Sequence, residues 1–571
     1  MSTTPDAAPI GFPETAGDKG LKSGAVGLIS TIVVGVASTA PAYSLAASLG
    51  FVVASGGALL AGVKAPAIIL LAFVPMYFIA VAYQELNKAE PDCGTSFTWA
   101  SRAFGPAVGW MTGWGIIAAD VIVMANLAQI AGSYSFSFAN TLGLHNTLSS
   151  NTFWSTVAGI IWIAVMTYIC YRGIEISARI QYGLLTIEVL VLFLFAAVAL
   201  YKVYSGHAES YSLHPQWSWL WPGGLSFTDV IAPALLTAVF IYWGWDSAVS
   251  INEETDDPAT TPGRAAVLST LILLFTYAIV TVAAVAFAGT GTEGIGLGNA
   301  KNAEDVFTAI SPQLFGNSGL GHVGQLLLAA SILTSASAST QTTILPTART
   351  ALSMAVYKAI PERFARIHPK YLTPTWSTIG MGVISIVFYL LFTLVSQSLL
   401  SALIGSIGLM IAFYYGLTGF ACTWFYRRNL FTSPRNFVMQ GLFPFLGGAI
   451  LIGAFCYAIK SYIAPDWLQD DDGNNITIFG QGAVAVVGIA ALALGIVLMI
   501  VWWSIKSDFF RQKTLPRKAA HELVLAGIPH DPAGDAEIRL PDAGLPDILI
   551  SDDLSNLPPG QRAVRREDLN D

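Results

Sequence analysis

Residues 27–50, GLISTIVVGVASTAPAYSLAASLG, form an apolar stretch with a proline, Pro41, near its middle. A bilayer core of about 30 Å takes about 20 apolar residues in a helix, so this stretch is long enough to span it. Proline has no backbone N–H donor and clashes with the preceding turn of a helix. We therefore expect a membrane helix that is interrupted at Thr39, Ala40 and Pro41, directly after Ser38.

A second interrupted stretch lies at 233–255, PALLTAVFIYWGWDSAVSINEET, where Gly244 stands between Trp243 and Trp245. Glycine alone is a weak helix breaker, but the order of the segments strengthens the prediction. This stretch belongs to the sixth apolar segment and 27–50 belongs to the first, as expected if five helices repeat. Transporters unwind helices near the membrane midplane to bind solutes, often at matching places in two repeats. We expect the second break at Tyr242, Trp243 and Gly244.

The whole chain has the composition of a membrane protein. Of its 571 residues, 54% are hydrophobic and 11% are charged, whereas soluble domains have about 25% charged residues. Twelve apolar segments are long enough to span a bilayer, which predicts an all-α polytopic membrane protein. They lie at 24–50, 64–86, 106–136, 152–171, 180–202, 228–250, 265–289, 320–347, 375–396, 399–425, 437–463 and 476–505.

The distribution of Lys and Arg predicts the orientation. Thirteen of these residues fall in loops on the side of the two termini, against four on the other side, Lys64, Lys202, Lys301 and Lys460. Because cytoplasmic loops carry the excess of basic residues, we expect both termini in the cytoplasm and the protein in the cell membrane. Residues 1–22 lack the pattern of a signal peptide and predict a short cytoplasmic tail. Residues 506–571 are polar, Pro-rich and acidic. This composition predicts a mostly disordered cytoplasmic tail.

Two acids lie inside predicted membrane helices. Asp120 is in GWGIIAADVIVMANLAQIAG and Glu188 is in ARIQYGLLTIEVLVLFLF, roughly 12 Å along the helix from Ile180. Intramembrane acids are costly, so they usually face a cavity and have a function. Burial favours the neutral form of a carboxyl group, so either acid can take up and release a proton near neutral pH. The alternative is an acid that stays neutral and is satisfied by a neighbouring helix.

The sequence contains no constellation that points to an enzyme. There is no HExxH, Walker or GxSxG motif, and the four cysteines form no CxxC pair, so we expect no catalysis, no metal and no cofactor. The lipid bilayer and a small-molecule substrate are the expected partners, and nucleic acid is not. Several serines at 331–339 have the small polar character of helix contacts, and one or two of them are candidates for lining a cation site.

Four stretches, in order along the chain, resemble the superfamily of amino acid–polyamine–organocation permeases. They are AYQELNKAEPDCGTSFTWASRAFGPAVGWMTGW at 82–114, ISARIQYGLL at 176–185, YWGWDSAVSINEETDDPATTPGRA at 242–265 and ARTALSMAVYKAIPERFARIHPKYLTPTWS at 348–377. The resemblance implies an inverted-repeat core of five plus five helices, at 23–425, with helices eleven and twelve, at 426–505, outside it. It also implies alternating access.

The resemblance further implies a solute site at the two helix breaks. In the superfamily, backbone amides at the first break hold a substrate carboxylate, and carbonyls at the second break hold the amine. By position, these sites fall on Ser38, Thr39, Ala40 and Pro41 and on Tyr242, Trp243 and Gly244.

This chain departs from the pattern twice. The usual Gly-rich run at the first break is here Thr-Ala-Pro, and Pro41 removes one donor. Many proton-coupled members of the superfamily carry a lysine in the fifth helix, and the matching position in this chain is Glu188.

The leading hypothesis is proton-coupled uptake of amino acids or related amines. Glu188 is then the proton-coupling residue, Asp120 binds a substrate ammonium, and Trp245 is a gate at the second break. Alternatively, Tyr242, Trp243 and Trp245 form a cation–π wall or only pack. The other functions considered are an obligate amino acid/polyamine exchanger, a cation transporter and a non-transporting sensor. The sequence leaves open which substrate is carried, which ion drives transport, and the oligomeric state.

Overall fold

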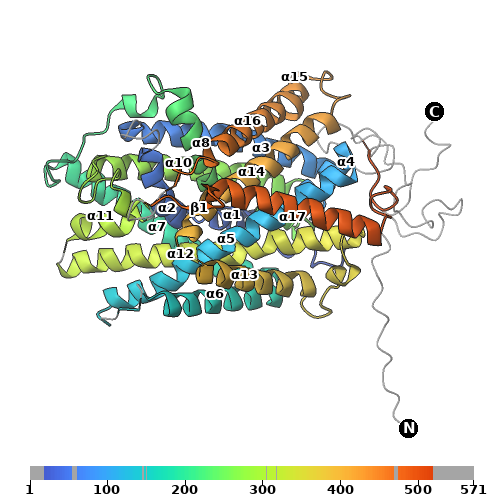
Figure 1. Cartoon of the computed structure of the whole chain (residues 1–571), viewed down its shortest axis with the longest axis horizontal. Helices are drawn as coiled ribbons and strands as arrows, with labels where there is room; N and C mark the ends of the chain where they lie inside the picture. The colour runs from blue at the N-terminus through green and yellow to red at the C-terminus, as the bar shows by residue number, and fades with distance from the viewer. Residues whose placement is uncertain are drawn as a thin grey trace, which may run out of the picture.

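The structure is a computed structural model that describes residues 19–54, 61–144, 147–148, 151–303, 305–316, 318–395, 397–468 and 474–518. Among these residues, eleven helices are long and apolar enough to cross a membrane. Their long axes run along the longest axis of the molecule, and α6 and α13 lie at the edge opposite α3 and α16 (Figure 1). The protein is therefore a multi-pass helical membrane protein, as the composition predicts.

The first half of the chain contains two broken helices and four continuous ones. Its elements are α1 (Leu28–Ser38), α2 (Pro41–Ala54), η1 (Gly62–Lys64), α3 (Ala65–Ala89), α4 (Ser96–Phe104), α5 (Pro106–Thr141), α6 (Thr152–Arg172), α7 (Ile174–Tyr204), η2 (Trp217–Leu220), η3 (Phe227–Ile231), α8 (Ala232–Tyr242), α9 (Ser247–Ser250) and η4 (Asn252–Glu254).

The second half continues with long helices and one short hairpin. Its elements are α10 (Thr261–Ala288), η5 (Ala300–Asn302), α11 (Val306–Phe315), α12 (Gly319–Val356), η6 (Glu362–Ala365), α13 (Thr375–Val395), α14 (Gln397–Phe425), α15 (Pro434–Asn436), η7 (Phe437–Leu442), α16 (Phe443–Tyr462), β1 (Thr477–Ile478), β2 (Gln481–Gly482) and α17 (Ala483–Ile505). The two strands pair antiparallel.

The first break lies where the sequence predicts it. α1 ends at Ser38, Thr39 is its C-terminal cap, and α2 begins at Pro41. Ala40 connects the two halves with a φ of 47°, a left-handed conformation that is uncommon for a residue with a Cβ atom. The kink is thus built from a proline, which starts the second half-helix, and one strained residue before it.

The second break is also confirmed. α8 ends at Tyr242, Trp243 is extended, and α9 begins only at Ser247. Gly244 has a φ of 121°, and a Cβ atom added there would lie 2.7 Å from the carbonyl oxygen of Ser38. A glycine is required because its backbone is left-handed and touches the backbone of the first break. This interruption leaves the shorter apolar helix Phe227–Tyr242, so the sixth of the twelve predicted segments is absent from the eleven candidate spans.

α5 and α12 pack closely against each other, and α12 also packs against α7. α16 packs against α3 and α14, whereas α17 packs against α5 and α14. The indole N–H of Trp114 on α5 donates to the carbonyl of Ala491 on α17, at 2.8 Å. Large apolar side chains such as Leu190, Leu394 and Val497 are exposed on the outside of the bundle, where a bilayer covers them.

Residues 507–518 of the expected C-terminal tail pack against the bundle. Phe509 and Leu515 are buried against Trp110 of α5 and Tyr357, which follows α12. The backbone N–H of Lys518 donates to the carbonyl of Arg102 on α4. The tail therefore starts with an ordered segment, while 519–571, the larger part of the expected tail, and 1–18 lie outside the described residues.

Candidate functional site at the two helix breaks

The two helix breaks face each other inside the bundle. The hydroxyls of Ser38 and Ser247 are 2.7 Å apart, which joins the end of α1 to the start of α9. The hydroxyl of Ser339 on α12 donates to the carbonyl of Ser38 at 2.9 Å. Tyr277 on α10 donates its hydroxyl to the carbonyl of Ile241, at 2.7 Å. Backbone carbonyls freed at both breaks are therefore held by side chains of α10 and α12.

The backbone N–H groups in the first turn of α2 are bonded to other groups of the protein. The backbone N–H of Ala42 donates to Oε1 of Glu188 at 2.8 Å, and the N–H of Tyr43 donates to the hydroxyl of Ser335 at 3.1 Å. The N–H of Ser44 bonds to the carbonyl of Ala40 at 2.7 Å. A helix N-terminus offers unpaired N–H groups and a partial positive charge. Here Glu188 and Ser335 satisfy those groups.

Glu188 projects from α7 and is completely buried. Its Oε1 also accepts the hydroxyl of Ser335 on α12 at 2.6 Å, so one oxygen joins three elements. Its Oε2 is buried and has no hydrogen-bond partner among the described residues. A buried unsatisfied carboxyl oxygen is costly. A proton or a cation on that second oxygen would remove this cost.

Asp120 and Asp246 form the acidic part of the site. Asp120 on α5 accepts the hydroxyl of Thr347 on α12 at 2.5 Å. Asp246, just after the second break, accepts the hydroxyl of Tyr414 on α14 at 3.0 Å. Asp120 is 3% exposed and Asp246 is 6% exposed, whereas Glu188 is fully buried.

The aromatic residues of the second break differ in their surroundings. Trp243 donates its indole N–H to the hydroxyl of Tyr414 at 2.5 Å, which brings it beside Asp246. The ring of Tyr242 meets that of Tyr277 edge to face, with centroids 5.0 Å apart. Trp245 stacks on Tyr415 with centroids 5.2 Å apart and is fully buried in an aromatic cluster. Its role as a gate stays a prediction.

The structure thus brings the two predicted breaks together, with Glu188 bonded to the first turn of α2. Asp120 is joined to α12 through Thr347. Sequence reasoning missed Thr347, Tyr414 and Tyr277, because nothing in their local pattern distinguishes them from packing residues. It included Ser335 and Ser339 only as members of a serine-rich run.

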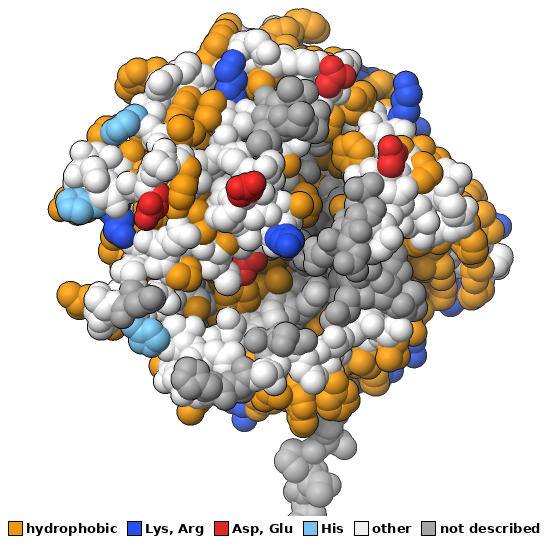
Figure 2. Space-filling view, turned by 60° about the vertical axis from the view of Figure 1, so that its left-hand side comes forward, with side chains coloured by type: hydrophobic (Ala, Val, Ile, Leu, Met, Phe, Trp, Pro, Cys, Tyr) orange, Lys and Arg blue, Asp and Glu red, His pale blue; other side chains and the backbone are white. Residues whose placement is uncertain are grey.

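One end of the bundle is closed by buried ion pairs. Lys19 contacts Asp92 at 2.9 Å and also Glu253. Arg349 of α12 pairs with Glu254 at 2.7 Å, and Arg102 of α4 pairs with Glu90, also at 2.7 Å. This layer lies at the end that carries Lys19 and residues 507–518. The opposite end, seen in Figure 2, is hollowed near its centre.

The electrostatics of this layer follow from its charges. Burial alone would lower the pKa of Lys19, but the carboxylates of Asp92 and Glu253 outweigh it and hold the pKa well above the usual value. Burial alone would raise the pKa of Asp92, but the ammonium of Lys19 and the hydroxyl of Ser353 hold it below its usual value. Both groups are therefore charged at neutral pH.

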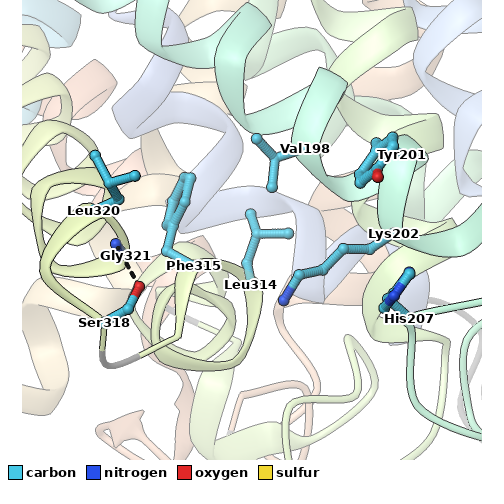
Figure 3. Close-up of a pocket in the computed structure, with 9 residues that line it drawn as sticks. All are labelled: Val198, Tyr201, Lys202, His207, Leu314, Phe315, Ser318, Leu320 and Gly321. Atoms are coloured by element: carbon cyan, nitrogen blue, oxygen red, sulfur yellow. Dashed lines mark hydrogen bonds between the residues drawn. The ribbon is translucent and has the colours of Figure 1, made fainter. Parts of the chain in front are cut away.

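A separate cavity of about 540 Å³ lies between the end of α7, α11 and the start of α12. The side chain of Lys202 points into it beside Leu314, and its other walls include Val198, Phe315 and Leu320 (Figure 3). It contains none of the site residues proposed from the sequence.

Comparisons with known proteins agree with this geometry. The model of a family described as amino acid permease matches residues 26–468. The chain is 25% identical over 427 residues to the branched-chain amino acid permease BcaP of Bacillus subtilis (strain 168), covering 71% of this chain and 82% of the relative. It is 24% identical over 217 residues to the low-affinity putrescine importer PlaP of Escherichia coli (strain K12), covering 37% and 44%.

A plant relative has a similar degree of identity. The chain is 24% identical over 352 residues to the cationic amino acid transporter 3, mitochondrial, of Arabidopsis thaliana, covering 60% of this chain and 54% of the relative. The family match extends over most of the chain, and it includes both helix breaks. The protein therefore belongs to the amino acid permease family and is a membrane transporter.

Proposed function

We propose that the protein is a secondary active transporter that takes up amino acids or related amines by alternating access, driven by a proton at Glu188. The observation that carries the proposal is the meeting of two broken helices around buried carboxyl groups. An unbroken helix satisfies its own backbone within a bilayer, whereas a broken helix offers backbone groups to a solute. The family membership agrees, and the names of two relatives state branched-chain amino acids and putrescine as their substrates.

Alternating access is supported by the contrast between the two ends of the bundle. Buried ion pairs close the end that carries Lys19, and the opposite end is hollowed (Figure 2). The excess of Lys and Arg supports a cytoplasmic position for the closed end and for both termini. In this arrangement a solute enters from outside, and the ion pairs must separate for its release inside.

Glu188 is placed to couple a proton to this motion. Its carboxylate accepts the N–H of Ala42 and so ties α7 to the half-helix α2. An ionised oxygen makes a stronger hydrogen bond than a neutral one, so protonation weakens this tie. Loading and release of a proton at Glu188 therefore changes how firmly α2 is held. We also propose that 23–425 is the transport core, that 426–505 lies outside it, and that the tail from 506 onward is cytoplasmic.

The test is uptake of labelled substrate into proteoliposomes with an imposed pH gradient. Glu188→Gln keeps the size and an acceptor oxygen but cannot ionise, so we expect uptake driven by the gradient to be abolished while exchange is partly retained. Glu175→Gln is the matched control on the same helix, because Glu175 is a half-exposed partner of Lys22. Unchanged gradient-driven uptake in Glu188→Gln would exclude the coupling role. A requirement for substrate on the far side would instead indicate an exchanger.

A further inference from the structure

We propose that the physiological substrate is an organic amine that lacks a carboxylate, and that Glu188 takes the place of a substrate carboxylate at the first helix break. This inference rests on the proposed transport function and specifies its substrate class. It follows from three features: the occupied N-terminus of α2, the acids Asp120 and Asp246, which have no basic partner among the described residues, and the position of the basic residues.

The N-terminus of a half-helix near the membrane midplane is suited to an anionic group of a substrate, because its N–H groups are unpaired. In this protein the first position, Pro41, has no N–H. The next donor, Ala42, is bonded to Glu188, and Tyr43 is bonded to Ser335. Ser44 bonds within its own turn. Every N–H of the first turn is therefore either missing or already used.

A substrate carboxylate at this place would have to displace Glu188 or lie beside it. Glu188 is bonded by Ala42 and Ser335 and is completely enclosed, so it has no solvated position nearby. Two carboxylates side by side in a low-dielectric interior repel each other strongly. The site therefore disfavours a second carboxylate while Glu188 is ionised.

The other side of the site favours a cation. Asp246 accepts the hydroxyl of Tyr414, to which Trp243 also donates, and Asp120 on α5 accepts the hydroxyl of Thr347 on α12. Both acids retain a little accessible surface. Within the described ranges, the buried Lys and Arg residues are Lys19, Arg102 and Arg349.

All three of those basic residues are paired with acids in the layer at the closed end. None of them neutralises Asp120 or Asp246. Buried acids are stable only when they are paired or protonated. A substrate ammonium supplies the missing positive charge, and the unpartnered Oε2 of Glu188 is a further buried acceptor.

The experiment compares ligands that differ only by the carboxyl group. The purified full-length protein is melted with putrescine against ornithine, and with isopentylamine against leucine, and uptake of each is measured in proteoliposomes. A ligand that binds the folded state raises the Tm with its concentration. We expect the amines to raise the Tm and to be transported. Each matched amino acid should require at least a tenfold higher concentration to give the same rise in Tm and the same uptake.

Equal or better binding and uptake of ornithine or leucine would overturn this inference and leave the transport function standing. Absence of binding and uptake for all four compounds would overturn the proposed uptake of amino acids or related amines, and the inference with it. The two failures are therefore distinguishable.

A pair of variants tests the part played by Glu188. Glu188→Ser removes the carboxylate and frees the N–H of Ala42, so we expect the preference for amine over amino acid to fall at least tenfold. Glu188→Gln keeps an acceptor oxygen on that N–H and should retain more of the preference. A merely structural role lowers the stability of both variants without changing the ratio of the two affinities. An unchanged ratio of the affinities for amine and amino acid in Glu188→Ser overturns the proposal. If that variant does not fold, a preference of the wild-type protein for the amino acids overturns it.

Discussion

The substitution Lys19→Met tests whether the buried ion pair holds the closed end of the bundle. The side chain of Lys19 is 0% exposed, and those of Asp92 and Glu253 are 4% and 8% exposed. Methionine fills similar space but leaves two carboxylates buried without their ammonium. Removing one partner of a buried pair costs about 3 to 5 kcal/mol, because the remaining charge is uncompensated. We expect a loss of that size in the free energy of unfolding.

The pH dependence of this effect has a definite sign. The pKa of Lys19 is raised, so its contribution is full below the ordinary value of 10.5 and is lost as the pH rises through the folded-state value. The pKa of Asp92 is lowered, so its contribution is full above the ordinary value of 3.8 and is lost as the pH falls through the folded-state value. In Lys19→Met, acid protonates the unpaired carboxylates. The difference in the free energy of unfolding between wild type and variant therefore shrinks as the pH falls.

The assay is reversible unfolding in mixed detergent micelles, followed by tryptophan fluorescence at neutral and at acid pH. Lys22→Met is the control, because Lys22 pairs with Glu175 at the surface with both side chains nearly half exposed. Such exposed pairs contribute about 0 to 1 kcal/mol. The reasoning would be refuted if the two variants lost equal free energy of unfolding, or if the loss in Lys19→Met did not change with pH.

Three further predictions follow from single features of the structure. Gly244→Ala should cost about 1 to 3 kcal/mol of stability and abolish uptake, because the left-handed backbone leaves no room for a Cβ atom; Gly183→Ala, where that atom meets open space, should be tolerated in the same assays. Asp120→Asn should remove the Tm increase caused by putrescine without unfolding the protein, and an unchanged increase would contradict its role in cation binding. Truncation after Lys506 should cost about 1.5 to 3 kcal/mol for each buried apolar side chain removed, whereas truncation after Lys518 should leave both stability and uptake unchanged.

The helix breaks were predictable because their causes are local. Pro41 lacks an N–H wherever the chain folds, and a glycine between two tryptophans marks a position that tolerates unusual backbone angles. The membrane spans were predictable for a similar reason, since a bilayer imposes one length on every helix that crosses it. The family resemblance added the expectation that the two breaks meet, which the contact between Ser38 and Ser247 confirms.

The partners of the buried acids were not predictable, because they come from distant parts of the chain. Glu188 bonds to Ala42, which lies 146 residues away, and Asp120 bonds to Thr347, which lies 227 residues away. No local sequence pattern distinguishes an acid that takes up and releases a proton from an acid that caps a helix. Likewise, Lys19 looks like part of a solvated tail until Asp92 and Glu253 are brought around it.

The sequence by itself determined that this protein crosses a membrane many times, where its helices are interrupted, and which family it resembles, because those properties depend on neighbouring residues and on the solvent. Only the tertiary structure decided which charges are paired. It put Lys19 between two acids at one end of the bundle and, among the described residues, gave Asp120 and Asp246 hydroxyl partners but no basic one. The free energy of a buried charge depends on what lies within a few ångströms of it, and that environment is assembled from segments far apart in the chain.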